Sequence, residues 1–527
     1  MQAPDSHAAG TMSERSAGHS ILKRSIATMI AIGVAVVLVL LLLSGLINRE
    51  IAWTASRSPR TPALPIRAHF ADTAAMFAAV DAYVKSEMNA VRAPGLSLAI
   101  VHGDQIVHRR SFGIADPQGR PVTSETPFIL GSLSKSFTAL AIMQQVGQGR
   151  VVLDAPVQRY LTWFAVRDSM ASTQITVRHL LNQTSGLPKS AGLQLIRGAE
   201  AATRAEEARL VTGVRLHHAP GAAFEYSNLN YWLLGLVLEA VTGTSYETYV
   251  HAHVFSPLGM THTYTDEREA QRHGLAQGYR GWFGFPRAEE LPYYWREMSV
   301  GYLISDADDM AKYLLAHLNG GSDGGPFVIS AQGLAELHTP PVGSPYAMGW
   351  LTDSVVGTSV LWHTGAVANY HGDMLIVPSA RWGVVMLSNV NSFVLEGQLS
   401  AAAKGVASLL LGYEPPRPRW IRFRAVYALI AALGVIWLAW RIKQVATLVR
   451  WRKSAASGPA EPVWWRPAGA LVDPGVALGL FVGVPLLLGS PLSTLRWFAP
   501  DLTDWLILNT VVALLTAGAR MAQRGVK

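Results

Sequence analysis

Uninterrupted apolar runs stand near both ends of the chain, and a long stretch of alternating and helical patterns lies between them. The first run covers residues 26–47. At 1.5 Å per residue, a helix of that length extends roughly 33 Å, which is enough to cross a bilayer core. Further apolar runs cover residues 425–442, 468–489 and 502–519. The pattern therefore predicts one N-terminal and three C-terminal transmembrane helices.

Basic residues beside these runs predict their orientation. Lys23 and Arg24 precede the first run, which places the N-terminal tail, residues 1–25, in the cytoplasm. The loop after the second run is rich in Lys and Arg, whereas Arg496 stands alone before the last run. By the positive-inside rule, the central stretch lies on the periplasmic side of a bacterial inner membrane, with the lipid bilayer as a partner. Cleavage of the first run as a signal peptide is the alternative, with Ser44-Gly45-Leu46 as a weak cleavage site.

The central stretch, residues 66–412, predicts one domain of mixed α and β structure. Residues 73–91 carry apolar side chains at helical spacing, and residues 95–110 read as two strands joined by Gly103-Asp104. Residues 346–389 contain β-rich pieces separated by glycine and proline, as in an antiparallel meander. A hairpin near one end and a meander near the other, with helices between them, predict an α/β fold in which helices flank an antiparallel sheet, plus a helical lobe.

Composition narrows the classes of function. The chain carries a net charge of +8 with a pI of about 9.6, but its basic residues bunch beside the apolar runs. That distribution is typical of membrane proteins rather than of nucleic-acid binding. Cysteine is absent, which excludes disulfides, a cysteine nucleophile and cysteine-bound zinc.

A serine and a lysine stand three residues apart where a small-residue turn runs into an apolar helical pattern. Ser132 and Lys135 share one face of that helix, so the lysine amine can reach the serine oxygen. The helix start also directs unpaired N–H groups and the positive end of the helix dipole at this oxygen. Serine needs a neighbouring base, and burial lowers the pKa of a lysine enough to supply one. A lone Ser-x-x-Lys occurs by chance on the order of once in such a chain, so further motifs are needed to decide whether this pair is catalytic.

Two further motifs follow Ser132-Leu133-Ser134-Lys135 in order, namely Tyr226-Ser227-Asn228 and His363-Thr364-Gly365. With them the chain resembles the serine β-lactamase and penicillin-binding-protein family over roughly residues 70–410. The likeness points to its class C branch, which includes family VIII esterases, D-aminopeptidases and DD-peptidases. The resemblance implies a β-lactamase/transpeptidase-like fold and an acyl-serine mechanism.

The resemblance also implies roles for single residues. Ser132 would be acylated, Lys135 would activate it, and Tyr226 would act as a second base and carry a proton to the leaving group. The N–H groups of Ser132 and Ala366 would form the oxyanion hole. The implied substrate-binding residues are Asn228, His363, Thr364 and Gly365. Which of Lys135 and Tyr226 takes the first proton stays open.

Histidine stands at position 363, where many members of the family have a lysine that holds a substrate carboxylate. A neutral histidine lacks that charge at pH 7. We therefore expect an esterase, amidase or aminopeptidase-like enzyme rather than an efficient β-lactamase or carboxypeptidase. The pairs His217-His218 and His251 with His253 lack a third ligand in the sequence, so neither a metal nor a cofactor is expected.

One N-terminal span, an exported domain and three C-terminal spans together resemble the membrane-bound peptidases that mature acylated peptide prodrugs, such as the colibactin-maturing type. That resemblance implies a small acylated peptide as substrate, from which an N-acyl-D-asparagine-like cap is removed. Asn228 and Asn369 would then contact the side chain of the D-residue. An esterase or a cell-wall D-amino-acid peptidase is one alternative, and a non-catalytic membrane sensor or cell-wall-binding protein is another. No nucleic-acid partner is expected, and a homodimer is allowed.

Overall fold

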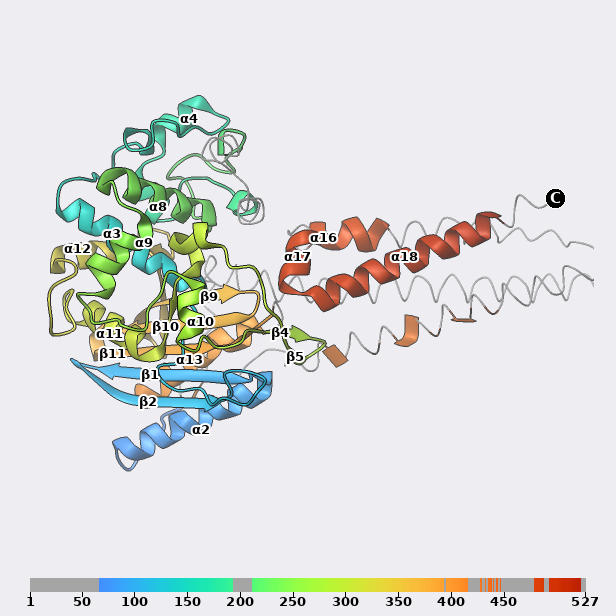
Figure 1. Cartoon of the computed structure of the whole chain (residues 1–527), viewed down its shortest axis with the longest axis horizontal. Helices are drawn as coiled ribbons and strands as arrows, with labels where there is room; N and C mark the ends of the chain where they lie inside the picture. Colours follow the sequence, from blue (N-terminus) through green and yellow to red (C-terminus); the bar gives the residue numbers. More distant parts are fainter. Residues whose placement is uncertain are drawn as a thin grey trace, which may run out of the picture. The chain divides into compact units, whose positions relative to one another are not determined.

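The computed structural model describes residues 66–192, 211–392 and 395–415, single positions between 427 and 446, and residues 478–487 and 492–522. The chain divides into two units, and Figure 1 labels many of their elements. The large unit is Arg57–Ala428 together with Trp497–Ala499. The small unit is Met1–Ser56, Leu429–Arg496 and Pro500–Lys527.

An antiparallel sheet of seven strands forms the centre of the large unit, in the order β2-β1-β11-β10-β9-β8-β7. Its strands are β1 (Gly95–His102), β2 (Gln105–Gly113), β7 (Tyr346–Ala347), β8 (Trp350–Val355), β9 (Thr358–Val367), β10 (Tyr370–Val377) and β11 (Trp382–Ser388). The predicted N-terminal hairpin and C-terminal meander join where β1 pairs with β11, from Leu96 opposite Ser388 to His102 opposite Trp382. Every residue of β10 is buried, as expected of a central strand covered on both faces.

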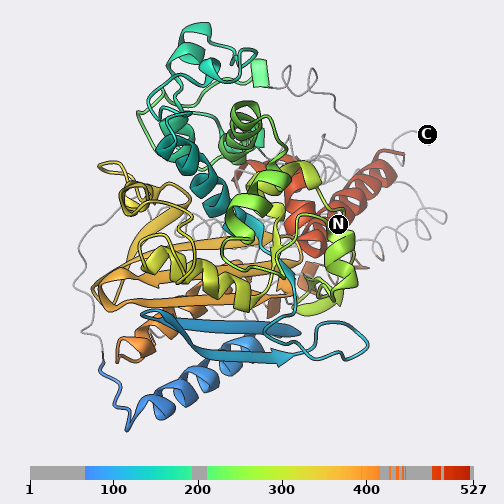
Figure 2. The same ribbon diagram turned by 60° about the vertical axis from the view of Figure 1, so that its left-hand side comes forward.

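Helices cover both faces of this sheet, as Figure 2 shows. Helices α2 (Thr73–Val91) and α13 (Glu396–Leu410) pack against each other on one face, and α11 (Ala307–Leu318) packs against β1 and β11 on the other. Asp72 caps the start of α2 by accepting a hydrogen bond from the Ala75 N–H. Arg92 ends that helix in the left-handed conformation. The predicted α/β fold with an antiparallel sheet flanked by helices is confirmed.

A helical lobe stands at the other end of the large unit and includes α3, which enters it from the sheet (Figure 1). Its helices are α3 (Ser134–Gly147), α4 (Ser169–Gln174), α5 (Val177–Leu181), α8 (Asn228–Thr242), α9 (Tyr246–Val250) and α12 (Ala331–His338). The shorter helical segments of the large unit, inside and outside the lobe, are η1 (Gly131–Leu133), η2 (Val157–Arg159), η3 (His251–Phe255), η4 (Trp295–Glu297), η5 (Met298–Tyr302) and η6 (Pro378–Ala380).

Two small sheets and one more helix complete the large unit. The elements are β3 (Phe128–Ile129) with β6 (Ile304–Ser305), β12 (Val390–Asn391) with β4 (Tyr279–Trp282) and β5 (Phe285–Ala288), and helix α10 (Glu267–Arg272). The β3–β6 pairing holds the segment that leads into α3 beside the segment that follows η5.

The small unit contains η7 (Gly479–Gly483), α16 (Val484–Leu487), most of α17 (Leu492–Phe498) and α18 (Pro500–Ala522). Within the described residues, one helix is long and apolar enough to cross a membrane, Pro500–Gly518, with a mean hydropathy of 1.2. It overlaps the predicted span at 502–519. The predicted tail at 1–25 and span at 26–47 lie outside the described residues, and the predicted spans at 425–442 and 468–489 lie largely outside them. The four-span topology and its orientation stay predictions.

Candidate active site

The start of α3 is packed directly against strand β9. Gly131 has φ of +58°, and a Cβ there would collide with the backbone nitrogen of Ala366. A Cβ on Gly365 would collide with the carbonyl oxygen of Leu130. Both positions therefore require glycine, and the close approach sets the Ala366 backbone beside the turn that carries Ser132. These are the two amides that the sequence analysis assigned to an oxyanion hole.

Lys135 lies beneath the serine and is fully buried. Its Nζ is 3.0 Å from Oγ of Ser132 and donates a hydrogen bond to the carbonyl oxygen of Val300 at 2.8 Å. Burial lowers the pKa of Lys135 to about 7, and the carboxyl of Glu297 acts in the opposite direction. A neutral amine that donates one hydrogen to Val300 keeps its lone pair for the serine proton. The predicted reach of lysine to serine is therefore present, with the protonation that a base needs near pH 7.

Tyr226 lies just before α8 and is hydrogen-bonded to the same Ser132 side chain. Lys135 Nζ lies 5.0 Å from the centre of the Tyr226 ring. Burial raises the pKa of Tyr226 above the usual range, while its hydrogen bond with Ser132 lowers it in part. The phenol is therefore protonated at pH 7. Lys135 and Tyr226 thus both adjoin one hydroxyl, with the protonation that their predicted roles as base and proton donor require.

A buried polar network holds the segment that carries Tyr226. The Gln183 carbonyl accepts a hydrogen bond from the Glu225 N–H at 2.9 Å, and the Gln183 side-chain oxygen accepts one from the Ser227 N–H at 2.9 Å. The same oxygen accepts a hydrogen bond from the Asn230 amide, whose own oxygen accepts one from Ser185 at 2.6 Å. The sequence analysis missed Gln183 and Asn230, because their partners are more than 40 positions away and no local pattern marks them.

His363 lies on β9, close to Tyr226, and is buried. Its Nδ1 lies 2.7 Å from the Thr364 carbonyl oxygen, so Nδ1 carries the hydrogen and donates. Its Nε2 lies 3.1 Å from the hydroxyl of Tyr346 and accepts. Burial, aided by the charge of Lys135, lowers the pKa of His363 to about 3. The imidazole is therefore neutral at pH 7.

The remaining predicted substrate contacts differ in how they are placed. Asn228 begins α8, and its side-chain oxygen is buried without a hydrogen-bond partner among the described residues. The Thr364 hydroxyl lies 3.1 Å from that of Ser400 on α13. The Asn369 amide donates to the carbonyl oxygen of Glu289 at 3.1 Å. The substrate roles of all three stay predictions.

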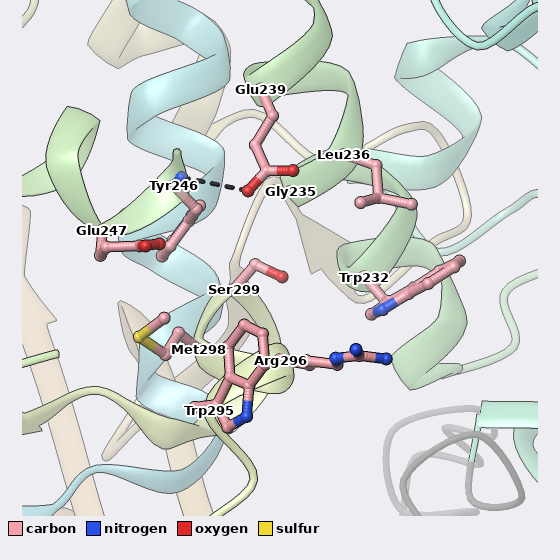
Figure 3. A pocket seen from close by; sticks show the side chains of 10 residues that line it. All are labelled: Trp232, Gly235, Leu236, Glu239, Tyr246, Glu247, Trp295, Arg296, Met298 and Ser299. Carbon is pink, nitrogen blue, oxygen red and sulfur yellow. Dashed lines mark hydrogen bonds between the residues drawn. The ribbon is translucent and has the colours of Figure 1, made fainter. Parts of the chain in front are cut away.

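A cavity of about 150 Å³ adjoins η5, and Figure 3 shows its lining side chains. Trp232 and Glu239 of α8, Glu247 of α9 and Trp295 of η4 lie around it. Ser299 lines the cavity, and its carbonyl oxygen accepts a hydrogen bond from Thr138 of α3. None of the predicted site residues lines this cavity, so it is separate from the serine site.

One group of potential metal ligands occurs in the described residues, formed by His262, Asp306 and Asp309. Asp306 caps α11, and Asp309 accepts hydrogen bonds from Thr263 at 3.0 Å and from Lys312 at 2.8 Å. The lysine ammonium neutralises a carboxylate of this group, so the cluster is explained as a structural ion pair and cap. The sequence analysis did not identify it.

Comparison with known proteins settles the family. A family model described as Beta-lactamase matches residues 80–408. The chain belongs to the beta-lactamase family. The beta-lactamase-family region includes every predicted site residue, from the serine of η1 to Asn369.

Curated relatives of this chain include a bacterial and a fungal protein. Protein flp of Staphylococcus aureus (strain MW2) is 29% identical over 320 residues, which cover 59% of this chain and 63% of the relative. Unguisins hydrolase ungD' of Aspergillus campestris (strain IBT 28561) is 27% identical over 325 residues, covering 58% of this chain and 60% of the relative. The chain thus spans about three-fifths of the length of these relatives.

Solved structures match about two-thirds of this chain. The octameric penicillin-binding protein homologue from Pyrococcus abyssi has a TM-score of 0.57 at 27% identity, over 65% of this chain and 78% of that one. A class C beta-lactamase in complex with cefoxitin has a TM-score of 0.55 at 20% identity, over 64% of this chain and 99% of that one. The latter likeness shows the fold alone. The predicted resemblance to beta-lactamases and penicillin-binding proteins is confirmed.

Proposed function

We propose that this protein is a membrane-anchored serine hydrolase that cleaves acyl-nitrogen bonds through an acyl-serine intermediate. The observation that carries the proposal is the buried Lys135, whose Nζ lies 3.0 Å from Ser132 Oγ and whose pKa is lowered to about 7. A lysine at this distance and in this protonation state can act as the base that activates a serine, whereas a buried amine contributes little to the stability of the fold. The intact set of serine, lysine and tyrosine argues against a non-catalytic sensor.

The geometry supports the following order of proton transfers. The neutral Lys135 amine takes the proton of Ser132 as Oγ attacks the substrate carbonyl carbon, and the Ser132 and Ala366 N–H groups stabilise the oxyanion. The tetrahedral intermediate collapses, the C–N bond breaks, and the Tyr226 hydroxyl gives its proton to the leaving nitrogen. Lys135 then returns its proton to Tyr226. Water then hydrolyses the acyl-serine. In this step the same side chains take a proton from the attacking water and return one to Ser132 Oγ.

The substrate class follows from His363. Because this imidazole is neutral and both of its nitrogens are hydrogen-bonded, it offers no cation for a substrate carboxylate. We propose a small acylated peptide as substrate, with an N-acyl-D-asparagine-like cap as the group removed. The Asn228 side-chain oxygen has no hydrogen-bond partner among the described residues, so we propose it as the acceptor for the amide of that cap. One relative is named unguisins hydrolase, which fits a hydrolase.

Turnover of three substrate classes by the purified full chain tests the proposal. The substrates are an N-myristoyl-D-Asn amide, a p-nitrophenyl ester and a D-Ala dipeptide, each compared with Ser132→Ala. We expect hydrolysis of the first and its loss in the variant. Turnover of the ester or the dipeptide alone would identify the esterase or cell-wall peptidase alternative. A fluorophosphonate that labels Ser132→Ala as strongly as the wild type would disprove the nucleophile.

The proposed location is the bacterial inner membrane, with the large unit on the periplasmic side. Helix Pro500–Gly518 and the apolar runs of the sequence support it. Because the chain contains no cysteine, Val342→Cys gives a single exposed thiol in the large unit. A membrane-impermeant maleimide should label this variant in intact spheroplasts. Labelling only after lysis would reverse the orientation.

A further inference from the structure

The β4–β5 hairpin ends in a turn that presents aromatic side chains at the protein surface. Trp282 pairs with Phe285, so the turn is the two residues Phe283 and Gly284. Both have positive φ, at 47° and 81°. Such turns favour asparagine or glycine, and a bulky residue in the left-handed region is strained. The strained Phe283 is 41% exposed and Phe285 is 61% exposed, so a large part of each ring faces solvent.

Arginines stand beside these rings. The guanidinium carbon of Arg92 lies 4.1 Å from the centre of the Phe285 ring, and Arg92 Nη1 donates to the Gly284 carbonyl at 3.3 Å. The guanidinium of Arg287 lies 5.4 Å from the centre of the Trp282 ring. Exposed aromatic rings combined with arginine suit the interface between lipid headgroups and acyl chains, where the rings enter the apolar layer and the cations meet phosphates.

The chain leaves the large unit beside this hairpin. Tyr427, next to the last residue of that unit's main segment, has its ring 6.4 Å from that of Phe283. The short return segment of the large unit, Trp497–Ala499, also lies here, because the Trp497 carbonyl accepts a hydrogen bond from Arg280 of β4 at 2.9 Å. Both of these connections to the small unit, which contains the apolar α18, therefore start at the β4–β5 sheet.

We propose that residues 282–287, the aromatic hairpin, insert into the headgroup region of the lipid bilayer and hold the large unit at the membrane surface. This inference rests on the proposed membrane anchoring. The lipid surface fits better than a protein partner, because the exposed rings carry paired cations and lie where the chain runs toward its apolar helix.

The hairpin also connects to the serine site. The Tyr279 N–H of β4 donates to the Asn369 carbonyl at 3.3 Å, and the Asn369 amide donates to the Glu289 carbonyl just after β5. Asn369 follows the strand that carries Ala366. An inserted hairpin would therefore hold the oxyanion-hole strand at a fixed depth, where the acyl chain of a membrane-dissolved substrate is within reach.

Fluorescence from single labelled cysteines tests the insertion directly. Phe283→Cys is labelled with an environment-sensitive NBD dye in the otherwise cysteine-free full chain, and the protein is reconstituted into phosphatidylethanolamine/phosphatidylglycerol nanodiscs. Val342→Cys is the matched control, because Val342 is fully exposed in another loop. We expect the Phe283 dye to be quenched several-fold more than the control by lipids with a nitroxide near the headgroup.

The outcomes separate this inference from the proposed anchoring. A chain that fails to enter nanodiscs would disprove the anchoring itself. A chain that enters, with its Phe283 dye quenched no more than the control, would overturn only the hairpin insertion. A blue-shifted dye that no lipid nitroxide quenches would show a protein partner or a second copy instead.

Activity gives a second readout that does not depend on the dye. Phe283→Ser combined with Phe285→Ser leaves the serine site intact, so hydrolysis of a soluble p-nitrophenyl ester should be unchanged. Hydrolysis of an N-myristoyl substrate held in the bilayer should fall about tenfold, because two aromatic anchors are lost. Equal activity of variant and wild type on both substrates would contradict the inference.

Discussion

Replacing Lys135 with methionine should abolish turnover and raise the stability of the large unit. The side chain is fully buried, and a fall in its pKa from 10.5 to about 7 corresponds to about 5 kcal/mol at about 1.4 kcal/mol per pH unit. Below pH 7 the lysine is protonated in both the folded and the unfolded state, so this cost of burying the charge opposes folding in full. Methionine has a similar length and carries no such cost.

The sign of the pH dependence follows from the same two pKa values. Between pH 7 and pH 10.5 the folded protein has lost the Lys135 proton while the unfolded chain keeps it, so wild-type stability rises with pH and the cost shrinks. At pH 9 about 2 kcal/mol of it remains. The methionine variant leaves the Val300 carbonyl without its donor, which costs about 1–3 kcal/mol at any pH. The net gain should be about 2–4 kcal/mol at pH 6 and near zero at pH 9.

Thermal unfolding of the full chain at pH 6, 7.5 and 9 measures this gain as a difference in Tm. Ser132→Ala is the matched control, since it inactivates the same site but keeps the buried amine, and its Tm should track that of the wild type. Glu297 is coupled to Lys135 and titrates in the same pH range, so the three proteins are also compared in the Glu297→Gln background, where that titration is absent. A methionine variant that unfolds at or below the wild-type Tm at pH 6 would refute the reasoning, as would a gain that does not shrink toward pH 9.

Three further predictions concern the surroundings of the serine. Tyr226→Phe should fold like the wild type by circular dichroism but lose about 10²–10⁴-fold in kcat, and an unchanged kcat would exclude the tyrosine as proton donor. Glu297→Gln removes the carboxyl that raises the pKa of Lys135, so the acid limb of kcat/KM should move to below pH 7; a limb that stays in place would show that Glu297 does not act on the lysine. Gly365→Ala should lower both kcat and Tm because its Cβ would collide with the Leu130 carbonyl, whereas Gly147→Ala, at an uncrowded position in α3, should leave both unchanged.

The sequence predicted the parts of the fold that depend on local pattern. The hairpin at residues 95–110 and the meander at 346–389 are strands because their residues alternate or are uniformly apolar, and the pairing of β1 with β11 follows once both are known. Ser132 and Lys135 could be placed together because three residues on a helix fix their separation. The pairing of these groups with Tyr226 came from a resemblance, since nothing local joins position 226 to position 132.

Features that depend on distant contacts escaped prediction. Gln183 reads as part of a loop, and its role as the acceptor that fixes Ser227 appears only when α5 and α8 are packed together. Glu297 is a polar residue in an ordinary-looking segment, yet it lies buried beside Lys135, where burial raises its pKa to about 8. The Phe283-Gly284 turn could not be predicted either, because phenylalanine is not a residue that favours a left-handed turn.

The hydrogen bonds of His363 also bear on inhibition. Penicillins and cephalosporins carry a carboxylate that needs a positive partner, and an imidazole whose Nε2 already accepts from Tyr346 gains no proton at pH 5. Mild acid therefore does not restore that partner. Antibiotics of this kind should be weak ligands across the physiological pH range, whereas uncharged acyl mimics, such as alkyl boronic acids built on an N-acyl-D-amide, should bind well. Selective inhibitors of this enzyme would then leave the cell-wall transpeptidases untouched.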